Sequence, residues 1–159
     1  MGCHISKSPN GITGRDTSFT YRGRVAMMCG SFGLELNPHE LTEDEVAQLP
    51  SIMAEAHRVN PIVISGDFYR LAGPQDSNWP AVQFVSQDGS QAVVFAFQQQ
   101  YTTKPAPPPL RLQGLDPKAR YFNDLDNGTY SGATYANAGI NAGWDRGIYQ
   151  SKLIWLEKR

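Results

Sequence analysis

The feature that most constrains the fold is a change of residue pattern near Asn60. From there on, short β-branched and aromatic segments alternate with turns, as in "PIVISGDFYRL", "AVQFVSQ", "QAVVFAFQQ", "LRLQGL", "ARYFND" and "YQSKLIWLEKR". Asp88-Gly89 lies between the second and third of these segments, and this dipeptide is a strong signal for a tight hairpin. Short strands joined by close turns predict an antiparallel β-sandwich of about one hundred residues.

A proline-rich segment, "TTKPAPPPL", interrupts the predicted strands. Proline has no backbone N–H to donate to a central strand, and it favours the extended polyproline II conformation. We therefore expect this segment to be a stiff crossover between strands or sheets.

The first part of the chain has a helical and loop-like pattern. "GCHIS" predicts a short buried strand, followed by a loop, "KSPNGITGRD", rich in turn-forming residues. Thr42 and Glu45 have the spacing of a capping box. An apolar stripe then predicts an amphipathic helix, and Pro50 predicts a kink or break within it near Leu49. The stripe consists of Val46, Leu49, Met53 and Ala56. Two domains follow from this change of pattern, residues 1–59 and residues 60–159.

Charge and hydropathy exclude several classes of protein. The formal net charge is −1, and Lys and Arg are scattered singly, so no basic stripe suits a nucleic acid. No apolar run approaches the ~20 residues of a membrane span, and the first residues lack the apolar core of a signal peptide. Cys3 and Cys29 have neither disulfide-framework nor zinc-site spacing, so we predict no metal and no cofactor.

Asp67 is the carboxylate that invites a catalytic interpretation. It lies in "GDFYRL" with Arg70 three positions later, whereas most other acidic residues fall in a helix first turn or a hairpin. A glycosidase needs two carboxylates that face each other across the bond to be cleaved. A structural role, in which Asp67 pairs with a nearby Arg or caps a turn, is favoured over a role as catalytic acid.

Four other residues are candidate site residues. His4 would end the short strand, where active-site residues of barrels lie, although a buried and hydrogen-bonded histidine is the competing interpretation. His39 and His57 are expected on the surface. Trp144 and Tyr149 offer flat rings for sugar binding, with packing inside the sandwich as the alternative. Asn127-Gly128-Thr129 is a glycosylation sequon, and Asn-Gly is equally ordinary turn chemistry.

Six segments together resemble the C-terminal portion of glycoside hydrolase family 36 α-galactosidases. In chain order they are "MGCHISKSPNGITGR", "FGLELN", "GDFYRL", "NWPAVQFVSQD", "RLQGLDP" and "TYSG". The chain departs from the family with "SPNGITGR" and "FGLELN", where "VPNHQTGR" and "FGYELD" are common. The resemblance implies that residues 1–59 are the last strand and helix region of an incomplete (β/α)8 barrel. Residues 60–159 would then be the C-terminal antiparallel β-sandwich.

The resemblance also implies an activity for the complete enzyme, namely retaining hydrolysis of terminal α-galactosyl residues from oligosaccharides. Both catalytic aspartates of the family lie N-terminal to the matching segments, so no catalytic residue is assigned and the isolated chain is expected to be inactive. Its expected partners are α-galactosides bound by the complete enzyme and the remainder of the barrel, in cis or in trans. A homo-oligomer is a further implied partner, whereas nucleic acid and membrane are not. An extracellular location is expected only if the parent enzyme is secreted.

Within this framework "GDFYRL" is the first sandwich strand. We expect Asp67 and Arg70 to fix its junction with neighbouring loops, while Phe68 or Tyr69 packs inward. Two alternatives stand beside the fragment of an α-galactosidase. One is a non-catalytic carbohydrate-binding or interaction module that uses Trp144 and Tyr149. The other is a complete small hydrolase that uses Asp67.

Overall fold

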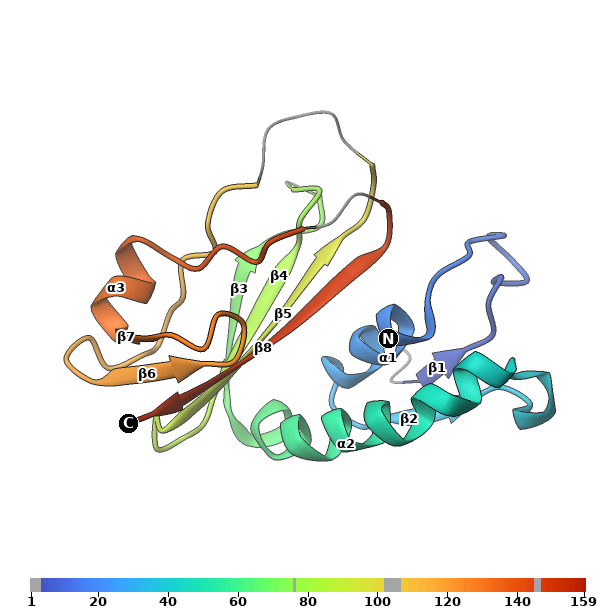
Figure 1. Ribbon diagram of the computed structural model, residues 1–159, viewed down its shortest axis with the longest axis horizontal. Helices are drawn as coiled ribbons and strands as arrows, with labels where there is room; N and C mark the ends of the chain where they lie inside the picture. The colour runs from blue at the N-terminus through green and yellow to red at the C-terminus, as the bar shows by residue number, and fades with distance from the viewer. Residues whose placement is uncertain (1–3, 76, 102–106, 145–146) are drawn as a thin grey trace. The chain divides into compact units, whose positions relative to one another are not determined.

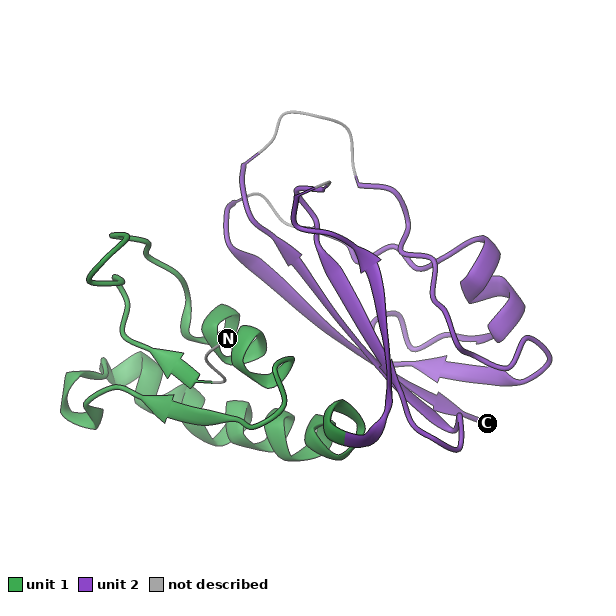
Figure 2. Cartoon of the chain, turned by 180° about the vertical axis from the view of Figure 1, so that it is seen from behind, with its two compact units in different colours: residues 1–64 green, residues 65–159 purple. Residues whose placement is uncertain are grey.

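The computed structural model describes residues 4–75, 77–101, 107–144 and 147–159, which fall into two compact units. Unit 1 comprises residues 1–64 and unit 2 comprises residues 65–159 (Figure 2). The boundary lies later than the predicted change at Asn60, because a helix continues through this position to Ser65. The "PIVIS" segment, predicted as a strand, is therefore the end of that helix.

Unit 1 is an α/β unit built on two parallel strands. Strand β1 (His4–Ser6) pairs with β2 (Gly33–Glu35), and helix α1 (Phe19–Met27) lies between them in the chain. Parallel neighbours need a crossover connection of this kind, which makes the segment a β-α-β unit. A short 3-10 turn, η1 (Pro38–Glu40), and the long helix α2 (Glu43–Ser65) follow.

Helix α2 begins at the predicted capping box. The Glu45 amide donates to Thr42 Oγ1 at 3.2 Å, and the Thr42 amide donates to Glu45 Oε2 at 3.1 Å. The predicted break is wrong, since α2 runs as one assigned helix with Pro50 and Pro61 inside it, and the alternative of a kink near Leu49 stays a prediction. Proline has no N–H to donate inside a helix, and a helix tolerates it where tertiary packing holds the flanking turns in place.

The buried face of α2 differs from the predicted stripe. Val46 and Met53 are exposed and Leu49 is half-buried, whereas Ala56 is buried as predicted. The other buried residues of α2 are Ile52, Val59, Ile62 and Val63. Polar residues of α2 share this face because they pair with α1: Glu45 with Arg22, Gln48 with Thr20, and Glu55 with Arg24. A hydropathy pattern counts only apolar residues as inward-facing, so it misses these charged and polar residues. The predicted stripe therefore differs from the buried face of α2.

Unit 2 contains a six-stranded antiparallel sheet in the order β3-β4-β5-β8-β6-β7 (Figure 1). The strands are β3 (Asp67–Ala72), β4 (Ala81–Val85), β5 (Gln91–Gln98), β6 (Arg120–Asn123), β7 (Thr129–Ser131) and β8 (Gln150–Lys158). The predicted mainly β class is confirmed. The Asp88-Gly89 hairpin is also confirmed, since β4 and β5 are adjacent and Gly89 has a φ of 66°.

One face of this sheet is covered by irregular segments. "LRLQGL" was predicted as a strand, but in the described structure it contributes a single antiparallel bridge between Leu110 and Ile140. Helix α3 (Gly132–Asn137) lies beside this bridge in the covering layer, where the Leu112 amide donates to the carbonyl of Tyr135 at 3.1 Å. The glycine at 132 is required there, because a Cβ would lie 2.2 Å from the Asp116 carbonyl oxygen.

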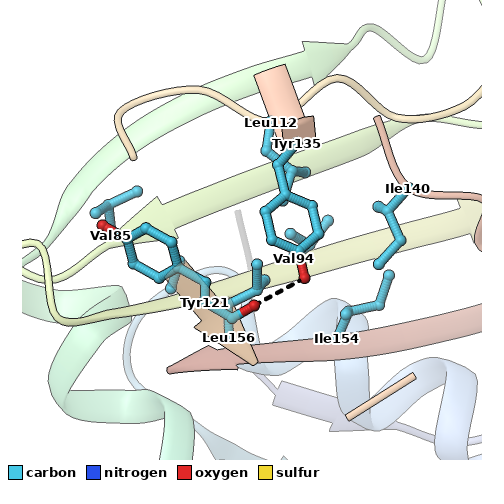
Figure 3. Close-up of a cluster of buried hydrophobic side chains, with 9 residues drawn as sticks. Val85, Val94, Leu112, Tyr121, Tyr135, Ile140, Ile154 and Leu156 are labelled. Carbon is cyan, nitrogen blue, oxygen red and sulfur yellow. Dashed lines mark hydrogen bonds between the residues drawn. The ribbon is translucent and has the colours of Figure 1, made fainter. Parts of the chain in front are cut away.

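The core of unit 2 lies between the sheet and this covering layer (Figure 3). Its buried members are Val85, Ala92, Val94, Leu112, Tyr121, Tyr135, Ile140, Ile154 and Leu156. The Tyr135 hydroxyl donates to the Tyr121 carbonyl at 3.1 Å and accepts from Asn123 Nδ2 at 2.8 Å. Tyr121 donates to the Gly89 carbonyl at 2.9 Å. These bonds satisfy hydroxyl groups whose burial would otherwise cost stability.

Most of the "GDFYRL" residues lie in β3, the first strand of unit 2. Tyr69 packs against the core cluster, as predicted, whereas Phe68 is exposed and its ring lies 5.3 Å from that of Phe84. Asp67 accepts from Gln87 Nε2 at 3.4 Å, and Arg70 is exposed. Within the described residues no ion pair joins Asp67 and Arg70, which point to opposite faces of the strand. The described residues give no support to the hypothesis that Arg70 fixes the junction, and that part of it stays a prediction.

Candidate functional site

A pocket of about 250 Å³ opens at the carboxyl end of β1. Two strand residues, five loop residues and three residues of α1 line it: His4, Ser6, Lys7, Asn10, Thr13, Arg15, Thr17, Tyr21, Arg22 and Val25. The carboxyl end of a parallel strand, where the chain turns back into a helix, is where α/β proteins bind ligands. Unit 1 alone forms this pocket.

The loop of the pocket is held by its own hydrogen bonds. Asn10 Oδ1 accepts from the amides of Ile12 and Thr13 at 3.1 and 2.9 Å. Ser8 Oγ donates to Asp16 at 2.7 Å and accepts from the Thr17 amide at 3.0 Å. The polar groups that line the pocket therefore stand on a well-braced loop, and its tip carries Ile12 with 96% of its surface exposed.

Three basic side chains of the pocket lie beside acidic residues outside it. Arg22, only 9% exposed, pairs with Glu45, donates to the Ser6 carbonyl, and its Nε has no hydrogen-bond partner. Lys7 Nζ lies 2.9 Å from Glu40, and His4 Nδ1 lies 3.6 Å from Glu35. These pairings offset the positive charge, so the pocket offers polar donors and acceptors more than a net cationic field.

The pocket lacks the groups for glycoside cleavage. No Asp or Glu is among its described lining residues, and glycoside hydrolysis normally needs two carboxyl groups flanking the bond. The hydroxyl, amide and guanidinium groups present suit hydrogen bonding to a polyhydroxylated molecule. Nowhere in the described parts of the chain do three His, Cys, Asp or Glu residues cluster as a metal site would require.

The predicted site residues lie in different parts of the molecule. His4 lines the pocket and is 47% exposed, so the interpretation of a buried histidine is wrong. Trp144 and Tyr149 are half-buried in the segment before β8, and the sugar platform stays a prediction. Asn127 is exposed in the turn between β6 and β7. Cys3 lies outside the described residues, and Cys29 is half-buried with its Sγ donating to the Val25 carbonyl at 3.4 Å.

Sequence reasoning missed most of the pocket. Tyr21 and Arg22 come from α1, and Asn10, Thr13 and Arg15 come from the loop that precedes it. The available signal was the sequence of a short strand, a loop rich in donors and a helix, which places the loop side chains at the carboxyl end of the strand. The contribution of α1 depends on how the helix packs, which no local pattern reveals.

No helix in the described ranges is long and apolar enough to cross a membrane.

Comparison with known proteins relates both units to glycoside hydrolases. Residues 79–156 match the family "Glycosyl hydrolase family 36 C-terminal domain", and residues 1–66 match the family "Melibiase". The chain is 54% identical over 159 residues to "Probable alpha-galactosidase C" of Aspergillus oryzae and to "Alpha-galactosidase 2" of Hypocrea jecorina. It covers 21% of each of these relatives, while 100% of the chain is aligned.

Solved structures agree over the whole chain. The GH36 α-galactosidase AgaB from Geobacillus stearothermophilus superposes with a TM-score of 0.92 at 36% identity, covering 100% of this chain and 22% of AgaB. A variant of AgaA from the same organism, in complex with raffinose, gives 0.93 at 35% identity with the same coverage. Fold and sequence thus define a C-terminal portion of a glycoside hydrolase. The chain belongs to glycoside hydrolase family 36, and it spans about a fifth of the length of its α-galactosidase relatives.

Proposed function

We propose that this chain is the structural C-terminal segment of a retaining α-galactosidase, and that the complete protein hydrolyses terminal α-galactosyl residues from oligosaccharides. The observation that carries the proposal is 54% identity to "Alpha-galactosidase 2" across all 159 residues, so that both units are included. The solved complexes of AgaA variants with raffinose and stachyose support this class of substrate.

In this proposal unit 1 supplies the last strand and helix region of a (β/α)8 barrel, and unit 2 is the C-terminal sandwich domain. A barrel takes about 250 residues, so most of it belongs to the remainder of the protein. The parallel pair of β1 and β2, with α1 between them in the chain, supports a barrel origin for unit 1. The remainder would join the open sheet edges of this pair, in cis or in trans.

Both catalytic carboxylates lie outside this chain in our proposal, and the isolated chain is inactive. Retaining glycosidases place two carboxyl groups about 5–5.5 Å apart. The pocket of unit 1 has no carboxylate among its described lining residues. In the complete enzyme its donors would bind hydroxyl groups of the oligosaccharide, since the loops at this face of a barrel build the substrate site.

The test is release of p-nitrophenol from p-nitrophenyl α-galactoside by the purified chain, with a full-length relative as positive control. We expect no release above the rate of a buffer blank. Turnover that survives rigorous purification and is lost in Asp67→Asn would overturn the proposal and make the chain a small hydrolase. If the inactive chain binds raffinose and Trp144→Ala abolishes this binding, the carbohydrate-binding module would instead be favoured.

A further inference from the structure

The turn between β6 and β7 carries a chemical signal that the proposed function does not use. Asn127-Gly128-Thr129 is the one Asn-X-Ser/Thr sequence, with X other than proline, in the 159 residues. Such a sequence is the acceptor for an N-linked oligosaccharide when it is presented on a surface loop of a secreted protein. The question is whether the turn needs the Asn127 side chain for itself.

Neighbouring residues make the hydrogen bonds that shape this turn. Asp126 Oδ1 accepts from the Gly128 amide at 2.7 Å, and the Asn123 amide donates to the Gly128 carbonyl at 2.9 Å. Asn123 Oδ1 accepts from the amides of Leu125 and Asp126, each at 3.1 Å. Among the described residues no hydrogen bond uses the Asn127 side chain, so its amide is not part of the structure that defines the turn.

The backbone of Asn127 holds its side chain at the outside of the turn. The residue is exposed and has a φ of 57°, in the left-handed region that Asn tolerates. A larger residue at Gly128 would force its neighbours to move, because a Cβ there would lie 2.4 Å from the Tyr130 ring and 2.6 Å from Asp126 Oδ1. The turn therefore selects Asn-Gly for its conformation, but the threonine at position 129 is not required by that conformation.

The position also suits a bulky polar attachment. The turn precedes β7, which is an end strand of the six-stranded sheet. End strands expose unpaired backbone groups that promote association between chains, and proteins block them with polar or bulky features. Beside the turn, Tyr130 is 42% exposed. An oligosaccharide here would cover this edge without displacing a buried group.

We propose that Asn127 carries an N-linked oligosaccharide when the chain passes through a eukaryotic secretory pathway. In the reaction Asn127 Nδ2 attacks C1 of the first sugar of a lipid pyrophosphate-linked oligosaccharide. The N–C1 bond forms, the bond from C1 to the pyrophosphate oxygen breaks, the amide nitrogen loses one proton, and lipid pyrophosphate leaves. This inference is independent of the proposed hydrolase function and fails or stands on its own.

The test uses the full chain behind a secretion signal in an Aspergillus oryzae host. The chain is recovered from medium and cells and treated with a glycan-releasing amidase in 18O water, and the tryptic peptide 121–146 is weighed. We expect an 18O-labelled aspartate at position 127, which appears only with amidase. The untreated control separates this from spontaneous deamidation of Asn-Gly.

Three variants make the result specific. Asn127→Asp keeps a residue that tolerates the left-handed conformation and removes the acceptor amide, so the glycan is lost. Thr129→Ala removes the hydroxyl and also loses the glycan, whereas Thr129→Ser retains it. Because the readout is a peptide mass, a variant that fails to fold still gives an answer. An unmodified peptide 121–146 in both medium and cells would overturn the proposal.

Discussion

The two units bury their residues by different means. Unit 2 closes a core of its own between a six-stranded sheet and a covering layer, and its buried polar groups are uncharged. Unit 1 has one two-stranded parallel sheet, and α1 is tied to α2 by Arg22–Glu45 and Arg24–Glu55. Parallel sheets are normally part of larger sheets covered on both faces. The contrast is what our proposal predicts, in which unit 2 is a complete structural domain and unit 1 is a part of one.

The polar groups in the core of unit 2 sharpen this contrast. Gln83, fully buried, donates to the Gln113 carbonyl and accepts from the Gln113 amide, both at 2.8 Å. The Gln83 side chain thus pairs with both backbone groups of Gln113 in the covering layer, as a neighbouring strand would. Satisfied networks of this kind favour one arrangement over others, because any alternative leaves buried groups unpaired. We therefore expect unit 2 to specify its own structure without the rest of the protein.

The largest expected effect comes from separating the units. Residues 65–159 alone should unfold in one cooperative urea transition, followed by circular dichroism, because the core cluster lies entirely within them. Residues 1–64 alone should show no cooperative transition, since a chain of about 60 residues with so small a sheet buries too little surface. Cooperative unfolding of residues 1–64, or its absence in residues 65–159, would break the comparison.

The next effect is expected at the centre of the unit 2 core. Tyr135→Ala should lower the free energy of unfolding by about 3–5 kcal/mol, because it empties a packed site and removes the hydroxyl that accepts from Asn123 Nδ2. Tyr130→Ala is the matched control: its ring contacts that of Tyr135 at 5.7 Å but is 42% exposed, so we expect a loss near 1 kcal/mol. Equal losses for the two variants in urea titrations would contradict this assignment of the core.

A smaller effect should appear on the acid side of the stability profile. Hydrogen bonds from Ser86 and from Ser90 lower the pKa of Asp88 from 3.8 to about 2. The folded state then binds fewer protons than the unfolded state between these values. The stabilisation is complete above pH 3.8 and is lost as pH falls toward 2.

Asp88→Asn keeps a turn-forming residue and removes this titration. Its urea midpoint should therefore depend less on pH between about 4 and 2 than that of the unaltered chain. The two proteins are compared at each pH, so that titration of Asp116, whose pKa is also lowered by the Lys118 amide, cancels in the difference. Parallel profiles through this window would show that the Asp88 hydrogen bonds do not persist in solution.

The smallest effect is expected at Arg70. Its exposed side chain makes no ion pair with Asp67, so Arg70→Ala should change the free energy of unfolding by less than about 0.5 kcal/mol. Tyr69→Ala, one position earlier on the face that packs against the core cluster, should cost several times more. A loss at Arg70 comparable to that at Tyr69 would restore the hypothesis that Arg70 fixes the start of unit 2.

Local signals in the sequence were sufficient where the structure is locally determined. The Thr42 and Glu45 capping box, the Asp88-Gly89 hairpin and the inward position of Tyr69 were all predictable. Ile62 and Val63 were assigned to a strand because β-branched residues favour strands. Their burial with Val59 on one helix face overrides that preference.

Features created by tertiary packing were beyond local reasoning. The Leu110–Ile140 bridge and the Gln83–Gln113 pair join residues about 30 positions apart, and no pattern of hydropathy or turns signals such pairs. In the pocket, His4 was predicted from its place at the end of a strand. Arg22 was not, because its inward position depends on the pairing with Glu45 across two helices.

The most direct test of the central claim is a chimera with "Alpha-galactosidase 2" of Hypocrea jecorina, to which the chain is 54% identical. Its corresponding C-terminal segment is replaced by residues 1–159, and hydrolysis of p-nitrophenyl α-galactoside is measured beside the parent and a deletion of the segment. We predict kcat/KM within about tenfold of the parent, or ~1.4 kcal/mol, and no activity in the deletion. A folded chimera without activity, or an active deletion, would contradict the claim that this chain completes an α-galactosidase.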